Sequence, residues 1–272
     1  LGKYVPEKVV TNHDLEKLMD TDHDWIVERT GIHERRHIDP GDGNTTAVMG
    51  YKAAKQALER ADVDKDDIDL IVFATLSPDY YFPGCGVQVQ EMLEIDTCPA
   101  LDVRNQCSGF IYGLSVADQF IKTGMYKTVL LIGSENHSGG LDMTTRGRNV
   151  SVIFGDGAGA AVLQQTDDTN HAVLSTHLHS QGKFAKELSV TSPSTLYWVD
   201  AIMKDSPMEN PPYYPYMNGQ FVFKNAVVRF AEVITEGLKA NQLSPEDVDL
   251  FIAHQANLRI AQFVQKKFKW TD

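Results

Sequence analysis

Cysteine is scarce in this sequence, and its spacing excludes two kinds of structure. The 272 residues contain three cysteines, none of which forms a C-x-x-C pair. An odd count without paired spacing argues against a disulfide framework and a structural zinc site, and is typical of a reduced, cytoplasmic protein. His177 and His179 stand two apart on a predicted strand, but two histidines without a third ligand do not predict a metal site.

Long apolar runs and basic character are also missing. No run of about 18 or more apolar residues occurs, which excludes a membrane-spanning helix. The 37 acidic and 25 basic residues give a formal net charge of −12. We therefore expect no nucleic-acid partner, because backbone phosphates require a basic face. No signal peptide is visible, and we expect a cytoplasmic protein.

An internal repeat is the most informative feature of the layout. Residues 57–74 and 237–254 align without a gap, so that Leu58 matches Leu238 and a buried apolar run ends each copy. Each copy has the pattern of a helix end, a polar turn and a strand of a parallel sheet. The sequence therefore predicts an internally duplicated, layered α/β fold. We place its two halves at residues 1–165 and 166–272.

Periodicity predicts the individual elements. We expect strands over 68–74, 100–103 and 128–133, and helices over 46–60, 86–93, 107–122 and 256–268. The glycine-rich stretch 151–165 predicts two strands bent around its glycines, and because no helix follows its GDGAGA motif, it does not predict a dinucleotide site. The Pro- and aromatic-rich segment 191–217 fits neither period. Two interpretations of this segment stay open, a functional loop and a surface insertion that is packed by its own aromatic side chains.

Cys107 lies between a predicted strand and a predicted helix, in the stretch DVRNQCSGFIYGL. A residue at a helix start faces unpaired backbone N–H groups and the positive end of the helix dipole, and this environment favours the thiolate. Gly109 leaves room for another backbone or a ligand to approach closely. The alternative is a buried thiol that only fills space.

His254 ends the predicted strand of the second repeat, where the first copy has Ala74. In a duplicated α/β fold, the ends of these two strands would meet at one crevice, where such folds bind ligands. Cys107 and His254 are therefore a candidate nucleophile and its proton or oxyanion partner. A lone structural histidine is the alternative.

Four motifs resemble those of the β-ketoacyl-acyl-carrier-protein synthase III family: DWIVERTGIHERR, NQCSGFIYGL, FGDGAGAAVL and AHQANLRI. They stand in the family's order, and the resemblance runs over essentially the whole chain. It implies a thiolase-like fold with α-β-α-β-α layers. It also implies an acyltransferase that joins an acyl group from coenzyme A to malonyl-acyl carrier protein in a decarboxylating Claisen condensation. No cofactor is expected, because the coenzyme A thioester is a substrate.

The resemblance also implies roles for single residues. Cys107 becomes acylated, and His254 helps stabilise the enolate and the thioester oxyanion. The family's catalytic asparagine is expected beyond residue 272, where we interpret the chain as truncated. The residues expected to contact coenzyme A are Thr21, Trp25, Arg29, Arg148 and Asn257, although Asn149 stands where many members of the family have glycine.

Three further surfaces are expected. By the family resemblance, Phe82 matches an aromatic residue of the family that reaches across a homodimer interface into the partner's acyl pocket. We expect Trp198 and Tyr214 of the aromatic segment to line that kind of pocket as well. Carrier-protein docking is assigned to a local basic patch that suits an acidic partner and consists of Arg259, Lys266, Lys267 and Lys269.

Several alternatives stay open beside this interpretation. Trp25 could be a packing aromatic, and the basic patch a solvated helix face. The enzyme could be a secondary-metabolic relative that primes or joins unusual acyl chains. A non-decarboxylating condensing enzyme is disfavoured because Phe82 stands where such relatives bring a glutamate. A non-catalytic partner subunit is disfavoured because Cys107 and His254 are both present.

Overall fold

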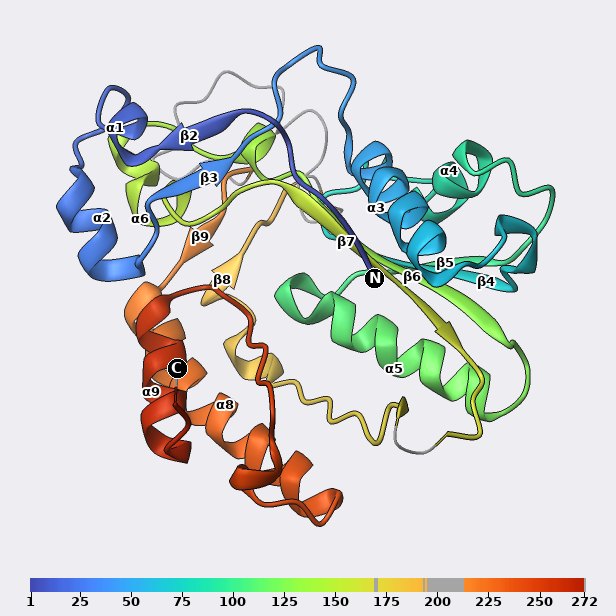
Figure 1. Cartoon of the computed structure of the whole chain (residues 1–272). Helices are drawn as coiled ribbons and strands as arrows, with labels where there is room; N and C mark the ends of the chain where they lie inside the picture. Colours follow the sequence, from blue (N-terminus) through green and yellow to red (C-terminus); the bar gives the residue numbers. More distant parts are fainter. Residues whose placement is uncertain (169–170, 193, 195–212, 272) are drawn as a thin grey trace. The chain divides into compact units, whose positions relative to one another are not determined.

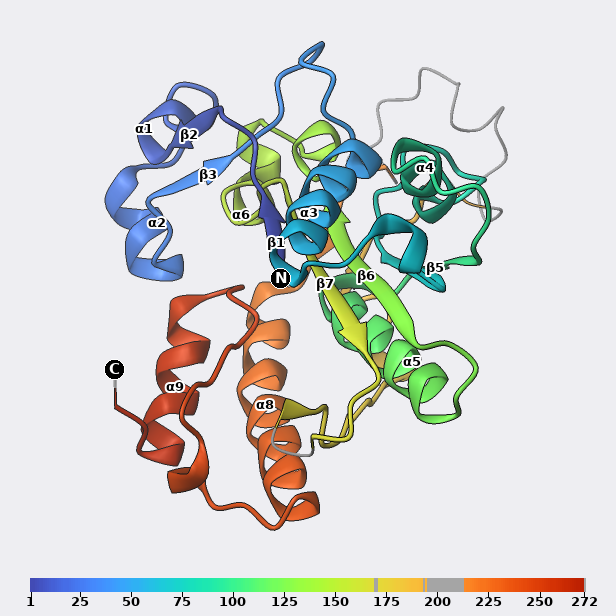
Figure 2. The same ribbon diagram turned by 45° about the vertical axis from the view of Figure 1, so that its right-hand side comes forward.

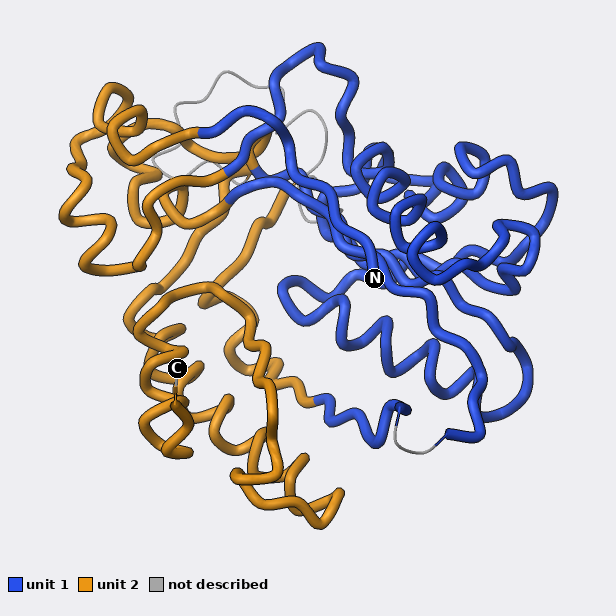
Figure 3. Tube along the Cα trace, in the orientation of Figure 1, with its two compact units in different colours: residues 1–9, 36–137, 155–178 blue, residues 10–35, 138–154, 179–272 orange. Residues whose placement is uncertain are grey.

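The chain forms two compact units whose segments alternate along the sequence (Figure 3). The computed structural model describes residues 1–168, 171–192, 194 and 213–271. Unit 1 comprises residues 1–9, 36–137 and 155–178, and unit 2 comprises residues 10–35, 138–154 and 179–272. The predicted boundary at residue 165 falls inside unit 1. The two units do not correspond to the two halves of the repeat, and the division at residue 165 stays a prediction.

Unit 1 is built on a mixed five-stranded sheet with the order β1-β7-β6-β4-β5 (Figure 1). The strands β4 and β5 run parallel, as do β4 and β6, whereas β7 is antiparallel to both β6 and β1. The bounds are β1 Gly2–Tyr4, β4 Leu70–Ala74, β5 Ala100–Val103, β6 Thr128–Glu135 and β7 Gly157–Gln164. Because β4, β5 and β6 are parallel, their carboxyl ends lie at one edge of the sheet.

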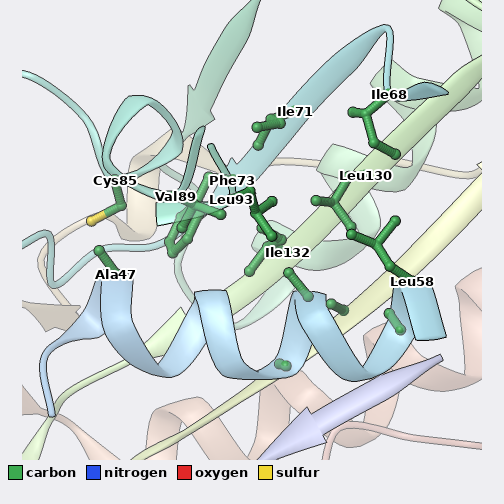
Figure 4. Close-up of a cluster of buried hydrophobic side chains, with 14 of the residues drawn as sticks. Ala47, Leu58, Ile68, Ile71, Phe73, Cys85, Val89, Leu93, Leu130 and Ile132 are labelled. Atoms are coloured by element: carbon green, nitrogen blue, oxygen red, sulfur yellow. The ribbon is translucent and has the colours of Figure 1, made fainter. Parts of the chain in front are cut away.

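Helices cover both faces of this sheet (Figure 1, Figure 2). They are α3 (Thr46–Ala61), α4 (Cys85–Met92) and α5 (Gly109–Lys122). Successive side chains of a strand point to opposite faces. Ile71 and Phe73 of β4 accordingly pack in the cluster formed with α3 and α4 (Figure 4), and Leu70 and Val72 pack in the cluster formed with α5. All five residues of β4 are buried, as the sequence predicts for a strand inside a parallel sheet.

Two glycines let α5 approach the sheet closely. A Cβ atom on Gly113 would lie 2.6 Å from Leu131 Cδ1, closer than carbon atoms can pack. A Cβ atom on Gly109 would lie 3.3 Å from Ala74 Cβ at the end of β4. Gly109 therefore lets the Ala74 side chain approach the start of α5 at the carboxyl end of β4, whereas approach by another backbone or a ligand stays a prediction.

The predicted repeat is confirmed in local backbone geometry for its helix and its turn. Val63 N–H donates to Leu58 O at 3.2 Å, and at the matching positions Leu243 N–H donates to Leu238 O at 2.9 Å. Each copy continues with a short 3-10 turn, and the two turns are Lys65–Asp67 and Pro245–Asp247. The sequence match therefore reflects two copies of one supersecondary element.

The predicted strand of the second copy does not form among the described residues. Residues 248–254 have irregular backbone, and Leu250 and Ile252 are 75% and 80% exposed. A strand needs a neighbour to pair its N–H and C=O groups. The strand of the first copy, β4, pairs with β5 and β6. Among the described residues of unit 2, no strand pairs with the corresponding segment of the second copy. The apolar run was thus correctly recognised, but its pairing was wrongly predicted.

Two further strand predictions are wrong. Residues 151–165 hold one strand, β7, rather than two, because the chain forms the short helix α6 (Arg148–Ser151) and then an irregular stretch before Gly157. His177 and His179 lie in irregular backbone rather than on a strand. Their ring nitrogens bind separate partners, with Ser175 Oγ 2.9 Å from the first and Glu236 Oε2 2.6 Å from the second.

Unit 2 has its own small core, formed mainly by Leu15, Met19, Ile26 and Val152. Its helices are α1 (Asn12–Leu15), α2 (His23–Thr30), α6, α8 (Gly219–Ala240) and α9 (Leu258–Phe268), and its strands include β8 (Leu188–Ser189) and β9 (Tyr216–Met217). Two further short strands pair with each other, β2 (Val9–Thr11) and β3 (Glu34–Arg36). None of the helices in the described part of the chain combines the length and apolar character needed to cross a membrane.

Candidate functional site

Cys107 lies on a single 3-10 turn, Gln106–Ser108, between β5 and α5. The predicted order of strand, cysteine and helix is therefore confirmed, with this turn inserted before the α-helix. Gln106 has φ of +42°, in the left-handed region that residues other than glycine seldom adopt. Asn105 Nδ2 donates to Ser108 Oγ at 3.0 Å and helps hold the turn. Such strain next to a thiol is characteristic of functional positions.

The three cysteines differ in exposure and in acidity. Cys107 is exposed, Cys98 is half-buried and Cys85 is buried. Burial raises the pKa of Cys85 to about 12 and also raises the pKa of Cys98. Both of these thiols are thus held in the protonated form. Cys107 is the most exposed of the three and the one most open to reagents in solution.

The pKa of Cys107 is raised as well, contrary to the expectation that a helix start favours the thiolate. Desolvation is the main cause, and the negative charge of Glu135 adds to it, whereas a backbone N–H bond to the thiol acts in the opposite direction. Solvent touches the residue, but the protein atoms around its sulfur still displace enough water to disfavour the anion. At neutral pH the thiol form of Cys107 therefore predominates in the free protein.

His254 belongs to unit 2 and precedes α9, in the irregular segment described above. The residue is exposed, yet partial desolvation lowers the pKa of its imidazole below the ordinary value. Loss of water disfavours the imidazolium form. The side chain is therefore neutral at physiological pH and can donate one N–H hydrogen bond.

Trp25, Arg29 and Arg148 come together in unit 2, as the family resemblance leads us to expect for residues that share a ligand. The guanidinium carbon of Arg29 lies 4.4 Å from the Trp25 ring centroid, and that of Arg148 lies 4.8 Å from it. Arg148 Nη1 also donates to Asp20 O at 2.5 Å, which ties α6 to the segment that precedes α2. Trp25 packs partly against the small core as well. The packing role and the binding role are thus compatible for this side chain.

The other two residues predicted to contact coenzyme A, Thr21 and Asn257, differ in their hydrogen bonding. Thr21 Oγ1 is buried without a hydrogen-bond partner among the described residues. Asn257 caps α9, because its Oδ1 accepts from Arg259 N–H at 2.9 Å and its Nδ2 donates to Arg29 O at 2.9 Å. Thr21 therefore has unused hydrogen-bonding capacity, whereas the side chain of Asn257 joins α2 to α9.

The predicted acyl-pocket residues lie in different places. Phe82 is in unit 1, follows the exposed residues Tyr80 and Tyr81, and is itself 83% exposed. Tyr214 is in unit 2, with the guanidinium carbon of Arg146 5.3 Å from its ring centroid. Trp198 lies outside the described residues. The pocket role of each residue stays a prediction.

The basic patch lies on α9 and just after it. Arg259 Nη2 lies 3.5 Å from Glu28 Oε1, which partly neutralises it. Lys266 and Lys267 are exposed in the last turn of α9, where positive charge stabilises the helix dipole. The lysines thus have a structural reason to be there in addition to any role in docking.

Two polar groups of the described structure were not identified from the sequence. Glu135 at the end of β6 carries a hydrogen-bonded carboxylate whose charge acts on Cys107. The buried Asp142 accepts from Arg146 Nε at 2.5 Å. A charged residue at the end of a strand with the apolar run Val129–Ile132 was the available signal for Glu135. In the described part of the chain, no three His, Cys, Asp or Glu side chains are placed to share a metal ion.

Comparison with known proteins gives a consistent result. The family model for 3-oxoacyl-[acyl-carrier-protein (ACP)] synthase III matches residues 101–182, which include Cys107. The β-ketoacyl-[acyl-carrier-protein] synthase III of Aliivibrio fischeri is 44% identical over 266 residues, which is 98% of this chain and 78% of that protein. The enzyme of the same name from Citrobacter koseri is 45% identical, with the same coverage.

Solved structures agree with the sequence relatives. The crystal structure of 3-oxoacyl-[acyl-carrier-protein] synthase III from Aquifex aeolicus VF5 matches with a TM-score of 0.87 and 38% sequence identity, over 98% of this chain and 79% of that one. The predicted thiolase-like α/β fold is therefore confirmed. Because this similarity extends over nearly the whole chain and more than three quarters of each relative, the chain belongs to the β-ketoacyl-[acyl-carrier-protein] synthase III family.

Proposed function

We propose that Cys107 carries the acyl group in this condensing enzyme of fatty acid synthesis. The observation that carries the assignment is that the exposed cysteine lies on the turn before α5, inside the segment matched by the family model. The Cys107 sulfur attacks the acyl-CoA carbonyl and forms a new thioester, the bond to the coenzyme A sulfur breaks, and the thiol proton passes to that sulfur. One thioester replaces another, so the exchange costs little free energy.

The second step joins this acyl group to a malonyl thioester. Loss of CO2 leaves its electron pair on the α-carbon, and the enolate attacks the acyl carbonyl. A carbon–carbon bond forms, the bond to the Cys107 sulfur breaks, and a β-ketoacyl thioester results. The neutral imidazole of His254 would donate a hydrogen bond to the thioester oxygen as negative charge develops there. The lowered pKa of His254 supports this role, because it keeps the donor uncharged.

Product analysis tests the reaction as a whole. The chain is incubated with a short acyl-CoA and malonyl-acyl carrier protein, and the carrier is weighed by mass spectrometry. A β-ketoacyl carrier that lacks the malonyl carboxylate supports the proposal. A product that keeps the carboxylate would indicate a non-decarboxylating enzyme, and absence of product despite an acylated Cys107 would indicate a partner subunit. The names of the relatives do not favour the secondary-metabolic alternative.

We further propose that the group of Trp25, Arg29 and Arg148 binds the nucleotide of coenzyme A. A flat aromatic ring suits a purine, and guanidinium groups suit phosphates. The unpaired Thr21 hydroxyl offers a hydrogen bond to the same ligand. For Asn257 we propose the supporting role of holding α2 and α9 together, through its bond to Arg29 O.

Replacing Trp25 with Ala should raise KM for acyl-CoA by about 10-fold or more, because base stacking contributes roughly 1–3 kcal/mol. Once Cys107 is acylated, the malonyl step should proceed at its usual rate. Trp270→Phe is the control, since Trp270 stacks on Phe268 with a ring-centroid distance of 5.0 Å. Steady-state kinetics and thermal melting are measured together. An unchanged KM with a lower melting temperature would mean that Trp25 only packs.

The enzyme should be a homodimer that buries Tyr80, Tyr81 and Phe82. Three adjacent exposed aromatic side chains are costly in water and typical of an interface. Light scattering of the wild type should give twice the chain mass, and Phe82→Asp should shift the mass toward one chain. A wild type that is monomeric at micromolar concentration and fully active would contradict the dimer.

Carrier-protein docking at Arg259, Lys266 and Lys267, and a cytoplasmic location, complete the proposal. The exposed lysines at the end of α9 offer charge complementary to an acidic carrier. The three unpaired cysteines suit a reducing compartment. We keep Phe82, Trp198 and Tyr214 as the proposed acyl-pocket residues.

A further inference from the structure

The carboxylate of Glu135 holds the chain that follows β4. Glu135 Oε1 accepts from Leu76 N–H at 2.9 Å, and Oε2 accepts from Ser77 N–H at 3.2 Å. Two hydroxyl groups also donate to Oε2, from Ser77 at 2.5 Å and Thr75 at 3.2 Å. Four donors around one half-buried carboxylate fix its position.

This carboxylate lies at the edge of the sheet that carries Cys107. Glu135 is the last residue of β6, and Thr75 follows the last residue of β4. Thr75 N–H donates to Val103 O at 3.1 Å, which joins the end of β4 to the end of β5. The start of α5 packs closely against Ala74. A Cβ atom on Gly109 would lie only 3.3 Å from Ala74 Cβ. Glu135, residues 75–77 and the Cys107 turn thus form one connected edge within unit 1.

We propose that Glu135 is a positioning residue that restrains the reactivity of Cys107, by fixing residues 75–77 and by placing a negative charge at the edge of the sheet where the Cys107 turn lies. The inference rests on the proposed role of Cys107 as the nucleophile. Its consequence is a smaller thiolate fraction at Cys107 than desolvation alone would leave, which limits oxidation and alkylation of an exposed cysteine. Glu135 itself forms no bond to substrate in this proposal.

The other charged groups around this edge have different partners or positions. Asp102 on β5 accepts from Cys85 N–H and Gly86 N–H at the start of α4. Asp79 accepts from Thr46 N–H and Ala47 N–H at the start of α3. Arg104, between β5 and the turn, is exposed, and His137, two residues after Glu135, donates its backbone N–H to Asp156. The electrostatic contribution to the raised pKa of Cys107 comes from Glu135.

Alkylation kinetics test the proposal without requiring acyl transfer. Iodoacetamide is added over a range of pH, and the Cys107 peptide is quantified by mass spectrometry. A negative charge disfavours the thiolate, so Glu135→Gln should move the pH midpoint downward and speed alkylation near neutral pH by about 3- to 10-fold. Glu135→Asp keeps the charge and should stay close to the wild type. An unchanged or higher midpoint in Glu135→Gln would overturn the proposal.

Asp69→Asn is the matched control. Its carboxylate also accepts two backbone N–H bonds, from Lys127 and Thr128, but at the opposite ends of the same strands. Its midpoint should equal that of the wild type, and a shift as large as that of Glu135→Gln would overturn the proposal. If Glu135→Gln fails to fold, Ser77→Ala decides. Losing a donor leaves the Glu135 charge less compensated, so the midpoint should rise, and an unchanged or lower midpoint would refute the role.

Because alkylation reports on the thiol alone, this outcome is separable from the proposed function. A shifted midpoint in a protein that makes no β-ketoacyl product would support the role of Glu135 and refute the condensing reaction. If Glu135→Gln leaves the alkylation midpoint unchanged but abolishes condensation, Glu135 acts as a base or a structural group, and the positioning proposal fails.

Discussion

Cys107→Ser should show no acyl adduct after treatment with acyl-CoA, and its condensation rate should fall by about 10³-fold or more. The hydroxyl of serine is far less acidic than a thiol and has no adjacent base assigned to it. Intact-mass measurement and peptide mapping give the test. In the wild type we expect one adduct, on the peptide that contains Cys107, because Cys85 is buried and Cys98 half-buried.

Cys98→Ser is the control for this experiment and should be acylated like the wild type. The pH dependence provides a second check. Because the pKa of Cys107 is raised, the thiolate fraction increases through neutral pH and into the alkaline range. Acylation should therefore accelerate with pH rather than level off near pH 7. Adducts on another cysteine, with Cys107→Ser still active, would refute the assignment.

The fold of unit 1 could be predicted because its patterns are local. The all-apolar run of β4 and the helix period of α3 each fixed an element to within a few residues. The position of Cys107 followed from the same logic, since it depends only on where β5 ends and α5 begins. The duplicated helix and turn were visible because two copies of one sequence pattern support each other.

The predictions that failed depend on what surrounds a segment. An apolar run such as residues 248–254 becomes a strand only beside a partner, and periodicity carries no information about the partner. The pKa of Cys107 depends in the same way on its surroundings. Helix-start reasoning considers the dipole alone, whereas desolvation by the neighbouring protein atoms is the largest influence here, and Glu135 from another strand adds to it.

The grouping of Trp25, Arg29 and Arg148 was available only through family resemblance. Trp25 and Arg148 are 123 residues apart in the sequence, and no helical or strand period links the two positions. Their proximity is accompanied by the hydrogen bond from Arg148 Nη1 to Asp20 O. Physical reasoning on one sequence can locate turns and strands, but it does not locate contacts of this range.

His254→Ala should leave acylation of Cys107 largely intact and slow malonyl decarboxylation by about 100- to 1000-fold. Loss of one preorganised donor costs this much because the negative charge on the thioester oxygen is then stabilised by fewer groups. Acylation by acyl-CoA and release of CO2 from malonyl-acyl carrier protein are measured separately. His179→Ala is the control, since the ring of that exposed histidine binds Glu236.

The pH profile makes the role of His254 specific. Its lowered pKa means that the neutral donor persists below the ordinary pKa of histidine, and protonation begins only at more acidic pH. Wild-type decarboxylation should therefore stay constant from neutral pH downward until the lowered pKa is reached, and then change. That acid limb should be absent from His254→Ala. If decarboxylation by His254→Ala proceeds near the wild-type rate with the limb unchanged, the histidine is structural and the oxyanion must be stabilised by other groups.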